Sequence, residues 1–344
     1  MGKLNERFIL QSNATHIQGY EQAGTLEDWR DKVASLCEGN HRLVMGVSAS
    51  FAAPLLHGLD QQGFGINYRG SSSIGKTTVL RVAKSVTGDH AHIRTWRATS
   101  SALESIAAMH NDNILLLDEM GEADAKEIGA TAYMLANGQG KARQTRTIEL
   151  RPATTWRLIY LSTGEVSLAE MLIQARQRVK AGQAVRIIDL PADSGSGYGI
   201  FDDIPVGLAG GAELADYLKE VTKENHGLPF VAYMSELVKD LPRHIETVKQ
   251  YRREWKAQYL PKEADSQVKR VADSFATLAA GGELATDFGI TGWGKGSAGF
   301  SVANCFRAWY LQRGGLGNQE EADILKFVRN HFEADGAAKY TFIN

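Results

Sequence analysis

The chain has 344 residues, and its 38 Lys and Arg residues against 40 Asp and Glu residues give a net charge of −2. Hydrophobic residues make up 43% of the chain and charged residues 23%, a balance that excludes wholesale disorder. The near-neutral charge excludes nucleic-acid binding by bulk positive charge, and two cysteines are too few for a disulfide framework or a cysteine-rich zinc site.

The first stretch, residues 1–61, is expected to be a helical region. Thr25 can cap a helix together with Asp28, and the apolar residues that follow recur at helical spacing. A second apolar helix is predicted over residues 43–56. Both helices are interpreted as packing elements.

The second stretch, residues 62–191, alternates short apolar runs with helical patterns, which predicts an α/β layer with a mostly parallel sheet and helices on both faces. The apolar run Ile114–Leu117 is typical of a central strand that is buried on both faces. The predicted elements are a strand at 64–68, helices at 77–86 and 100–109, a strand at 114–117, a helix at 124–135 and a strand at 156–161.

Two further stretches complete the expected organisation. Residues 192–262 open with a glycine-serine loop and are predicted to form a helical extension or lid, with helices at 211–224, 229–238 and 241–258. Residues 263–344 are predicted to form a C-terminal helical region, with helices at 263–278, 302–312 and 319–332. That region is expected to be a winged-helix-like DNA module, a lid or an oligomer contact.

Residues 70–77, Gly-Ser-Ser-Ser-Ile-Gly-Lys-Thr, match the phosphate-binding pattern G-x-x-x-x-G-K-[ST] at every fixed position. The glycines let backbone N–H groups turn toward phosphate oxygens, and a helix N-terminus follows directly. Lys76 is expected to reach the β and γ phosphates of ATP, and the Thr77 hydroxyl to ligate Mg²⁺. The residues expected to bind the nucleotide are Gly70, Ser71, Ser72, Ser73, Ile74, Gly75, Lys76, Thr77 and Thr78.

An acidic pair, Asp118 and Glu119, follows the apolar run, and the carboxyl ends of such strands are where open α/β sheets bind ligands. Asp118 is expected to hold Mg²⁺, and Glu119 to polarise the water that attacks the γ-phosphate. The second carboxylate favours hydrolysis over phosphoryl transfer to a small substrate. At the tip of the next strand, Thr163 or Ser162 is expected to help position that water.

Basic residues gather in residues 138–157, where Lys141, Arg143 and Arg146 are candidates for DNA binding. The alternation around Arg146 fits a β-ribbon, which either follows a nucleic-acid backbone or is an ordinary surface hairpin. Farther on, Arg186 adjoins a predicted strand and is the favoured candidate for an arginine finger that reaches a neighbouring subunit's nucleotide.

No apolar run approaches the roughly 20 residues that a membrane-spanning helix needs, and the start of the chain lacks a long apolar signal core. No membrane partner is therefore expected, and a cytoplasmic location is predicted.

Several phrases occur together in an order that resembles the ATPase domain of Cch-like helicases, a domain-of-unknown-function family of bacterial mobile elements, phages and plasmids. The phrases are residues 24–29, 70–78, 117–119, 137–143, 161–165 and 291–293. This resemblance implies an AAA+/RecA-like P-loop NTPase that forms a ring, with a hexamer favoured, and that is related to replicative DNA helicases.

By this likeness, Gly70, Gly75, Lys76 and Thr77 match the Walker A positions, Asp118 and Glu119 match Walker B, and Thr163 falls near sensor 1. Members of the family are often joined to a primase module. The chain is therefore expected to be one piece of a larger primase–helicase or a stand-alone helicase subunit.

The favoured function is an ATP-hydrolysing DNA helicase or translocase of a replication module, which acts on DNA, single-stranded for preference, with ATP bound between subunits. The alternative is a nucleotide-dependent switch or assembly ATPase that never unwinds DNA. A third hypothesis is a phosphotransferase that uses the same loop.

Overall fold

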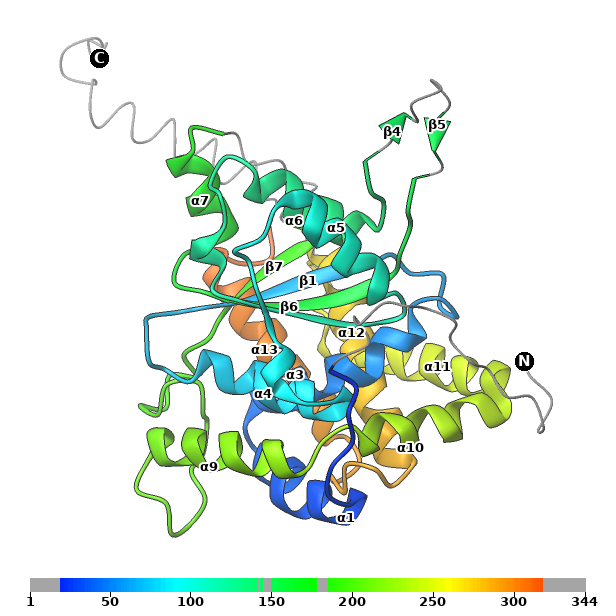
Figure 1. Ribbon diagram of the computed structural model, residues 1–344. Coiled ribbons are helices and arrows are strands. Elements are labelled where there is room, and N and C mark those ends of the chain that lie inside the picture. Colours follow the sequence, from blue (N-terminus) through cyan, green and yellow to red (C-terminus); the bar gives the residue numbers. More distant parts are fainter. Residues whose placement is uncertain (1–18, 142, 145–149, 152, 178–184, 318–344) are drawn as a thin grey trace, which may run out of the picture.

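A computed structural model describes residues 19–141, 143–144, 150–151, 153–177 and 185–317. Its centre is a five-stranded parallel sheet with the strand order β2-β3-β6-β1-β7, and helices cover both of its faces (Figure 1). The predicted α/β class with a mostly parallel sheet is therefore confirmed. The strands are β1 Phe64–Arg69, β2 Arg94–Thr95, β3 Asn113–Asp118, β6 Leu158–Gly164 and β7 Ile187–Pro191.

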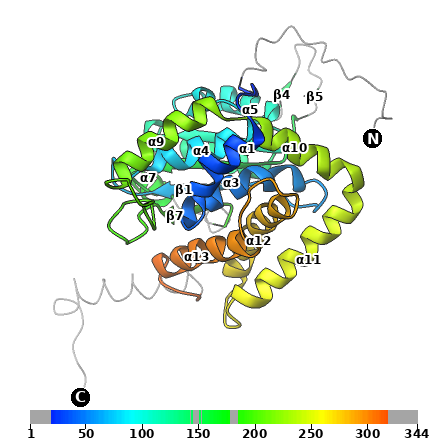
Figure 2. The same ribbon diagram turned by 90° about the horizontal axis from the view of Figure 1, so that it is seen from below.

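Three helices cover one face of the sheet: α5 Ser100–Met109, α6 Ile128–Asn137 and α7 Leu168–Gln174 (Figure 1). The opposite face is covered by α3 His41–Ala52, α4 Lys76–Thr87, α12 Ser266–Asp287 and α13 Ser297–Gln312. Seen from below, α9 Gly211–Glu224 and α10 Leu228–Leu237 lie beside α4, and α11 Leu241–Tyr259 lies along α12 (Figure 2).

Short helical segments complete the described helices. The N-terminal segment runs as α1 Leu26–Trp29, a π-helix Arg30–Ala34 and α2 Ser35–Cys37. The 3-10 helices are Ala53–Leu55, His90–His92, Met120–Glu122 and Val238–Asp240.

Helices bury both faces of the sheet, and successive side chains of its strands point to opposite faces, so that each strand contributes to two cores. Ile66 and Leu116 lie in the core beneath α3, α4 and α12, whereas Leu115 and Tyr160 lie in a second core beneath α5, α6 and α7. The same alternation decides which polar side chains at the strand ends face the phosphate loop.

Two glycines in the middle of α12 allow close helix packing. A Cβ atom on Gly281 would lie 2.7 Å from the backbone N of Ala52, and one on Gly282 would lie 2.3 Å from the Oγ of Ser48. Both neighbours belong to α3. Helix α12 therefore approaches α3 at a distance that only glycine permits.

Several predicted boundaries are wrong by a few residues. Helix α6 starts at Ile128 rather than at 124, because residues 124–127 form turns. Helix α12 runs on to Asp287 instead of ending at 278, since its apolar stripe continues to Ala285. Helix α13 starts at Ser297, five residues before the predicted start.

The strand predicted at 156–161 is shifted toward its carboxyl end and becomes β6. Trp156 lies before the strand, where its Nε1 donates to the carbonyl oxygen of Leu135 at 3.0 Å. Pairing with β1 extends the strand as far as Gly164. Ser162 and Thr163 are therefore part of the strand and not of the turn after it.

The predicted β-ribbon corresponds to an antiparallel pair, β4 Arg143–Gln144 and β5 Leu150–Arg151, which projects from the body (Figure 1). The predicted helix at 319–332 lies outside the described residues. Within the described ranges, no helix is both long enough and apolar enough to cross a membrane.

Candidate functional site

The phosphate loop joins β1 to α4, so that residues 70–75 lie at the carboxyl edge of the sheet. Ser73 and Gly75 have positive φ angles of 63° and 93°, and Gly75 directly precedes the first turn of α4. A Cβ atom on Gly75 would also lie 2.8 Å from Ile200. Glycine is therefore required at this position both for its backbone conformation and for space.

Lys76 is buried, with 7% of its surface exposed, although its side chain carries a charge. Its Nζ donates to the carbonyl oxygens of Gly70 at 2.8 Å and Ser71 at 2.6 Å. The ammonium group thus lies inside the curve of the loop, beside the backbone of Gly70 and Ser71.

Thr77, Asp118 and Thr163 form a chain of contacts across three elements. The Thr77 hydroxyl of α4 donates to Asp118 Oδ2 at 3.2 Å, and the Thr163 hydroxyl of β6 donates to Asp118 Oδ1. Thr163 Oγ1 also accepts a hydrogen bond from the backbone N of Glu119 at 3.0 Å. The carboxylate at the end of β3 is therefore held on both sides.

Thr163 and Ser162, which the sequence could not separate, point to opposite faces of the sheet. Ser162 Oγ accepts from the indole Nε1 of Trp96 at 2.8 Å, in the core beneath α5 and α6. Thr163 faces the phosphate loop. Of the two residues, only Thr163 contacts Asp118 within the described hydrogen bonds.

Glu119 follows β3 with its side chain exposed and its backbone in the left-handed region, at φ 57° and ψ 69°. This conformation is costly for a residue with a Cβ atom, on the order of 1 kcal/mol or more. The hydrogen bond from Glu119 N to Thr163 holds the backbone in place. Glu119 thus has a strained but hydrogen-bonded backbone directly after Asp118.

The residues around Thr77 fit a magnesium ion. A hydroxyl and a carboxylate oxygen, Thr77 Oγ1 and Asp118 Oδ2, lie 3.2 Å apart. Hard oxygen donors are the ligands that Mg²⁺ prefers, and neighbouring ligands of an octahedral ion lie about 2.9 Å apart. When bound with a nucleotide, such an ion neutralises the charge of the phosphates.

A second wall of the site is the loop that follows β7. The backbone N of Ile200 donates to the carbonyl oxygen of Ile74 at 2.8 Å, which links this loop to the phosphate loop. A cavity of about 570 Å³ lies beside the junction, between the two loops and the start of α9.

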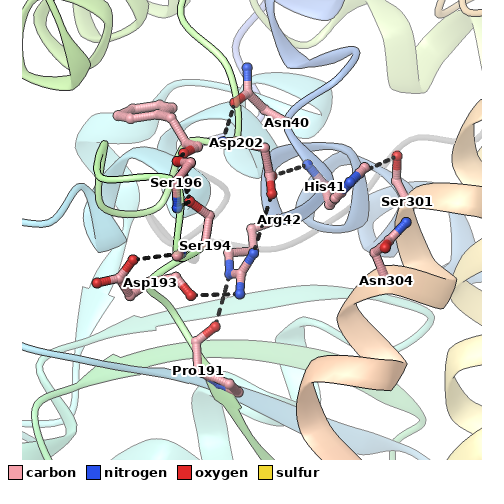
Figure 3. Close-up of polar contacts among 12 residues, drawn as sticks. Asn40, His41, Arg42, Pro191, Asp193, Ser194, Ser196, Asp202, Ser301 and Asn304 are labelled. Carbon is pink, nitrogen blue, oxygen red and sulfur yellow. Dashed lines mark hydrogen bonds and ion pairs between the residues drawn. The ribbon is translucent and has the colours of Figure 1, made fainter.

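Arg42 holds that second loop in place from α3 (Figure 3). Its guanidinium group is buried and donates to the carbonyl oxygens of Pro191 at 2.8 Å and Asp193 at 2.7 Å. It also lies 3.8 Å from Asp202 Oδ1, and Asp202 Oδ2 accepts from the backbone N of His41 at 2.7 Å.

The contacts of Arg42 and Asp202 were not predicted. The only signal in the sequence is a charged residue at the start of an otherwise apolar helix. From α13, Ser301 Oγ lies 3.3 Å from His41 Nδ1, so that the network also reaches the C-terminal helices (Figure 3). Burial lowers the pKa of His41 from its usual value.

A buried polar pair lies on the other face of the sheet near the phosphate loop. Asn67 of β1 donates from Nδ2 to Asp189 Oδ1 of β7 at 2.7 Å. Burial raises the pKa of Asp189 to about 6, although the hydrogen bond from Asn67 lowers it.

Arg186 lies at the amino end of β7, at the edge of the sheet opposite to the phosphate loop. Its carbonyl oxygen accepts from the backbone N of Gly65, at the start of β1, and its guanidinium lies 5.1 Å from the centre of the Tyr133 ring. The five residues of β7 separate it from the loop end by roughly 17 Å. Arg186 therefore lies too far from the phosphate loop of its own chain to contact phosphates bound there.

Two of the three candidate DNA-binding residues, Lys141 and Arg143, also lie at that opposite edge, where the ribbon leaves α6 and returns to β6. Lys141 is exposed, and Arg143 belongs to β4 and pairs in register with Arg151. Arg146 lies outside the described residues.

Two comparisons with known proteins give matches. A family model described as a domain of unknown function (DUF927) matches residues 1–155. A solved structure titled "SCCmec type IV Cch - active helicase" matches with a TM-score of 0.62 and 19% identity, covering 86% of this chain and 51% of that chain. The chain thus spans about half the length of that helicase. No curated protein matches.

At 19% identity, the structural match shows a shared fold. The match to DUF927 covers residues 1–155, which is less than half of the chain.

Proposed function

We propose that this chain is an ATP-hydrolysing motor of the DNA helicase or translocase class. One observation carries the proposal: Lys76, Thr77, Asp118, Thr163 and Glu119 meet at the carboxyl edge of β1, β3 and β6. These residues come from three segments of the chain, and each has the chemical group that phosphate binding and hydrolysis require.

Each of these residues has a proposed role. The loop of residues 70–78 binds the phosphates, with Lys76 at the β and γ phosphates of ATP. Thr77 and Asp118 hold Mg²⁺. Glu119 takes a proton from the attacking water, and Thr163 positions both acidic residues through its two hydrogen bonds.

DNA binding is proposed for the basic ribbon. Lys141, Arg143 and Arg146 stand within six consecutive residues of a chain whose net charge is −2, and the described strands of this segment, β4 and β5, project from the body. Contacts between such residues and phosphates give affinity without choice of sequence, which suits a motor that moves along single-stranded DNA. The matched structure is titled a helicase, which agrees with this proposal.

A ring, hexameric for preference, with ATP between subunits is proposed because Arg186 is too far from its own phosphate loop to act there. Arg186 then serves as the arginine finger of the neighbouring site. The ATPase core is proposed to be residues 62–191, with the stretch 192–262 as a lid. Residues 1–61 and 263–344 are proposed to be helical regions around this core. A primase module is proposed as a partner.

The test is ATP hydrolysis with Mg²⁺, measured with and without single-stranded DNA. We expect stimulation by DNA, and salt-dependent DNA binding that weakens when Lys141, Arg143 and Arg146 are replaced by Ala. The slope of log affinity against log salt should fall by about 2, since each phosphate contact on single strands contributes about 0.7. Neutralising Lys223, Lys239 and Lys249 is the matched control, because these lysines lie outside the ribbon, on α9, on the 3-10 helix Val238–Asp240 and on α11.

Hydrolysis that DNA does not stimulate, together with no salt-sensitive DNA binding, would favour the switch or assembly ATPase. Transfer of the γ-phosphate to a small acceptor instead of phosphate release would favour the phosphotransferase.

A further inference from the structure

The cavity beside the phosphate loop is lined by three segments of the chain. It shares Ser73, Ile74 and Gly75 with that loop, and its volume of about 570 Å³ lies within the range of small-molecule sites. The other walls are the loop after β7, with Tyr198 and Phe201, and the first turn of α9. A ligand whose phosphates lie in the loop would place its other end here.

We propose that this cavity receives the base of a nucleoside triphosphate, with Tyr198 stacked on the ring and with little choice between adenine and guanine. The inference rests on the proposed binding of nucleotide phosphates by residues 70–78, and it adds the substrate class of that site.

Tyr198 provides the stacking surface. Its side chain is 47% exposed in the wall of the cavity, whereas the neighbouring aromatic residue, Phe201, is buried at 1%. Phe201 N donates to the carbonyl oxygen of Tyr198 at 3.4 Å, so that the two residues close a tight turn. An exposed ring on such a turn offers a flat apolar face, and stacking on nucleobases does not depend on which base is present.

Glycines bring the cavity wall close to the phosphate loop. Gly199 has a φ of 67°, and a Cβ atom there would lie 2.6 Å from the carbonyl oxygen of Ile74. A Cβ atom on Gly211 would lie 2.9 Å from the carbonyl oxygen of Tyr198. The backbone of the wall therefore lies where a base attached to loop-bound phosphates would reach it.

Few side chains of this cavity can read the edge of a base. Of the lining residues, all of which are described, only Ser73, Tyr198 and Glu213 have polar side chains. Glu213 Oε2 accepts from the backbone N of Ala209 at 2.6 Å, which engages its carboxylate. Discrimination between bases depends on placed hydrogen-bonding groups, so this lining predicts weak preference.

Hydrogen bonds within the protein fix the wall of the cavity that follows β7. Ser194 Oγ and Ser196 Oγ both donate to the carbonyl oxygen of Phe201, at 2.7 and 2.6 Å, and Arg42 binds the start of the same loop (Figure 3). A preorganised wall costs less entropy on binding, which suits a stacking platform.

The test is isothermal titration of the full chain with MgATP, MgGTP and Mg-tripolyphosphate. For Tyr198→Ala we expect about ten-fold weaker binding of ATP and of GTP and unchanged binding of tripolyphosphate. Tyr198→Phe should bind ATP as the unchanged chain does, since it retains the ring. Ala212→Trp, which fills the cavity from the exposed first turn of α9, should weaken ATP but not tripolyphosphate.

Tyr217→Ala is the matched control, because Tyr217 is 43% exposed on α9 but does not line the cavity. Unchanged ATP affinity in both Tyr198→Ala and Ala212→Trp would overturn the inference while leaving phosphate binding intact. A preference of more than about a hundred-fold between ATP and GTP would overturn the weak discrimination. Failure of the unchanged chain to bind tripolyphosphate and ATP would instead refute the proposed function itself.

Discussion

Glu119 combines a strained backbone with a carboxylate that is proposed to act in catalysis. Its backbone occupies the left-handed region at φ 57°, a conformation that costs free energy for residues other than glycine. The hydrogen bond from its N–H to Thr163 opposes that cost. The strain at this position therefore offers no gain in stability that would account for a glutamate there.

Replacing Glu119 by Gln should lower ATP turnover at least about a hundred-fold and leave ATP affinity unchanged, because the amide cannot accept the proton of the attacking water. Steady-state phosphate release and titration with ATP would measure the two effects. Glu122→Gln, on the neighbouring 3-10 helix, is the control. Normal turnover in Glu119→Gln would exclude the residue from catalysis.

Asp189 predicts a pH-dependent stability. Burial raises its pKa to about 6 in the folded chain, compared with 3.8 for an ordinary aspartate. Between these values the folded state binds more protons than the unfolded state. Asp189 therefore contributes to the free energy of unfolding below pH 3.8, and this contribution is lost as the pH rises through 6. Relative to Asp189→Asn, the unchanged chain should become less stable from pH 4 to pH 7.

Urea unfolding at several pH values would measure this difference. Asp216→Asn, which removes an exposed carboxylate of α9, controls for the change in net charge. A stability difference between Asp189→Asn and the unchanged chain that did not vary with pH would contradict the prediction.

At the scale of elements, the loop after β7 depends on α3. Arg42, which is 5% exposed, donates to two carbonyl oxygens at the end of β7 and beyond it, and it faces Asp202. Asn40 Oδ1 accepts from the backbone N of Asp202 at 2.8 Å and of Asp203 at 3.1 Å. Helix α3 therefore supports the wall of the site from below the sheet.

Replacing Arg42 by Met should destabilise the fold by about 3 kcal/mol, since it removes the hydrogen bonds of the guanidinium to two partly buried carbonyl groups and its ion pair with Asp202. Urea unfolding would give the free energy, and hydrogen exchange should increase over residues 192–203 in particular. Arg307→Met, an exposed position on α13, should change the stability by less than about 0.5 kcal/mol. Equal effects of the two variants would contradict the assigned role of Arg42.

At the scale of the whole molecule, the sheet separates two groups of candidate residues. The phosphate loop, Asp118 and Thr163 lie at its carboxyl edge, whereas Arg186 and the root of the basic ribbon lie at its amino edge. Under the proposed function, Arg186 therefore reaches a nucleotide only in a neighbouring subunit.

This arrangement predicts complementation between subunits. Arg186→Ala alone should lower turnover by about 10³-fold, and mixing it with inactive Lys76→Ala subunits should restore turnover, because the latter still supply Arg186. Sedimentation with a non-hydrolysable ATP analogue would measure ring formation in each mixture. Arg157→Ala, at the same edge, is the control. Absence of rescue in mixed rings would remove Arg186 from the trans role.

The phosphate loop, the acidic pair and the order of strands and helices were predictable because each depends on local pattern. A G-x-x-x-x-G-K-[ST] match and an apolar run that ends in carboxylates are contiguous in sequence. Hydrophobic periodicity likewise indicated the helices, although their ends shifted where packing extended a stripe, as in α12.

What the amino-acid sequence by itself determined is therefore the α/β class and the segments that meet at the candidate site. Only the tertiary structure distinguished Thr163 from Ser162, because pairing with β1 carries β6 through both residues and turns one to each face. It alone brought Arg42 to the loop after β7 and Tyr198 to the cavity beside the phosphate loop, since contacts between residues so far apart in the chain follow from packing and leave no local pattern.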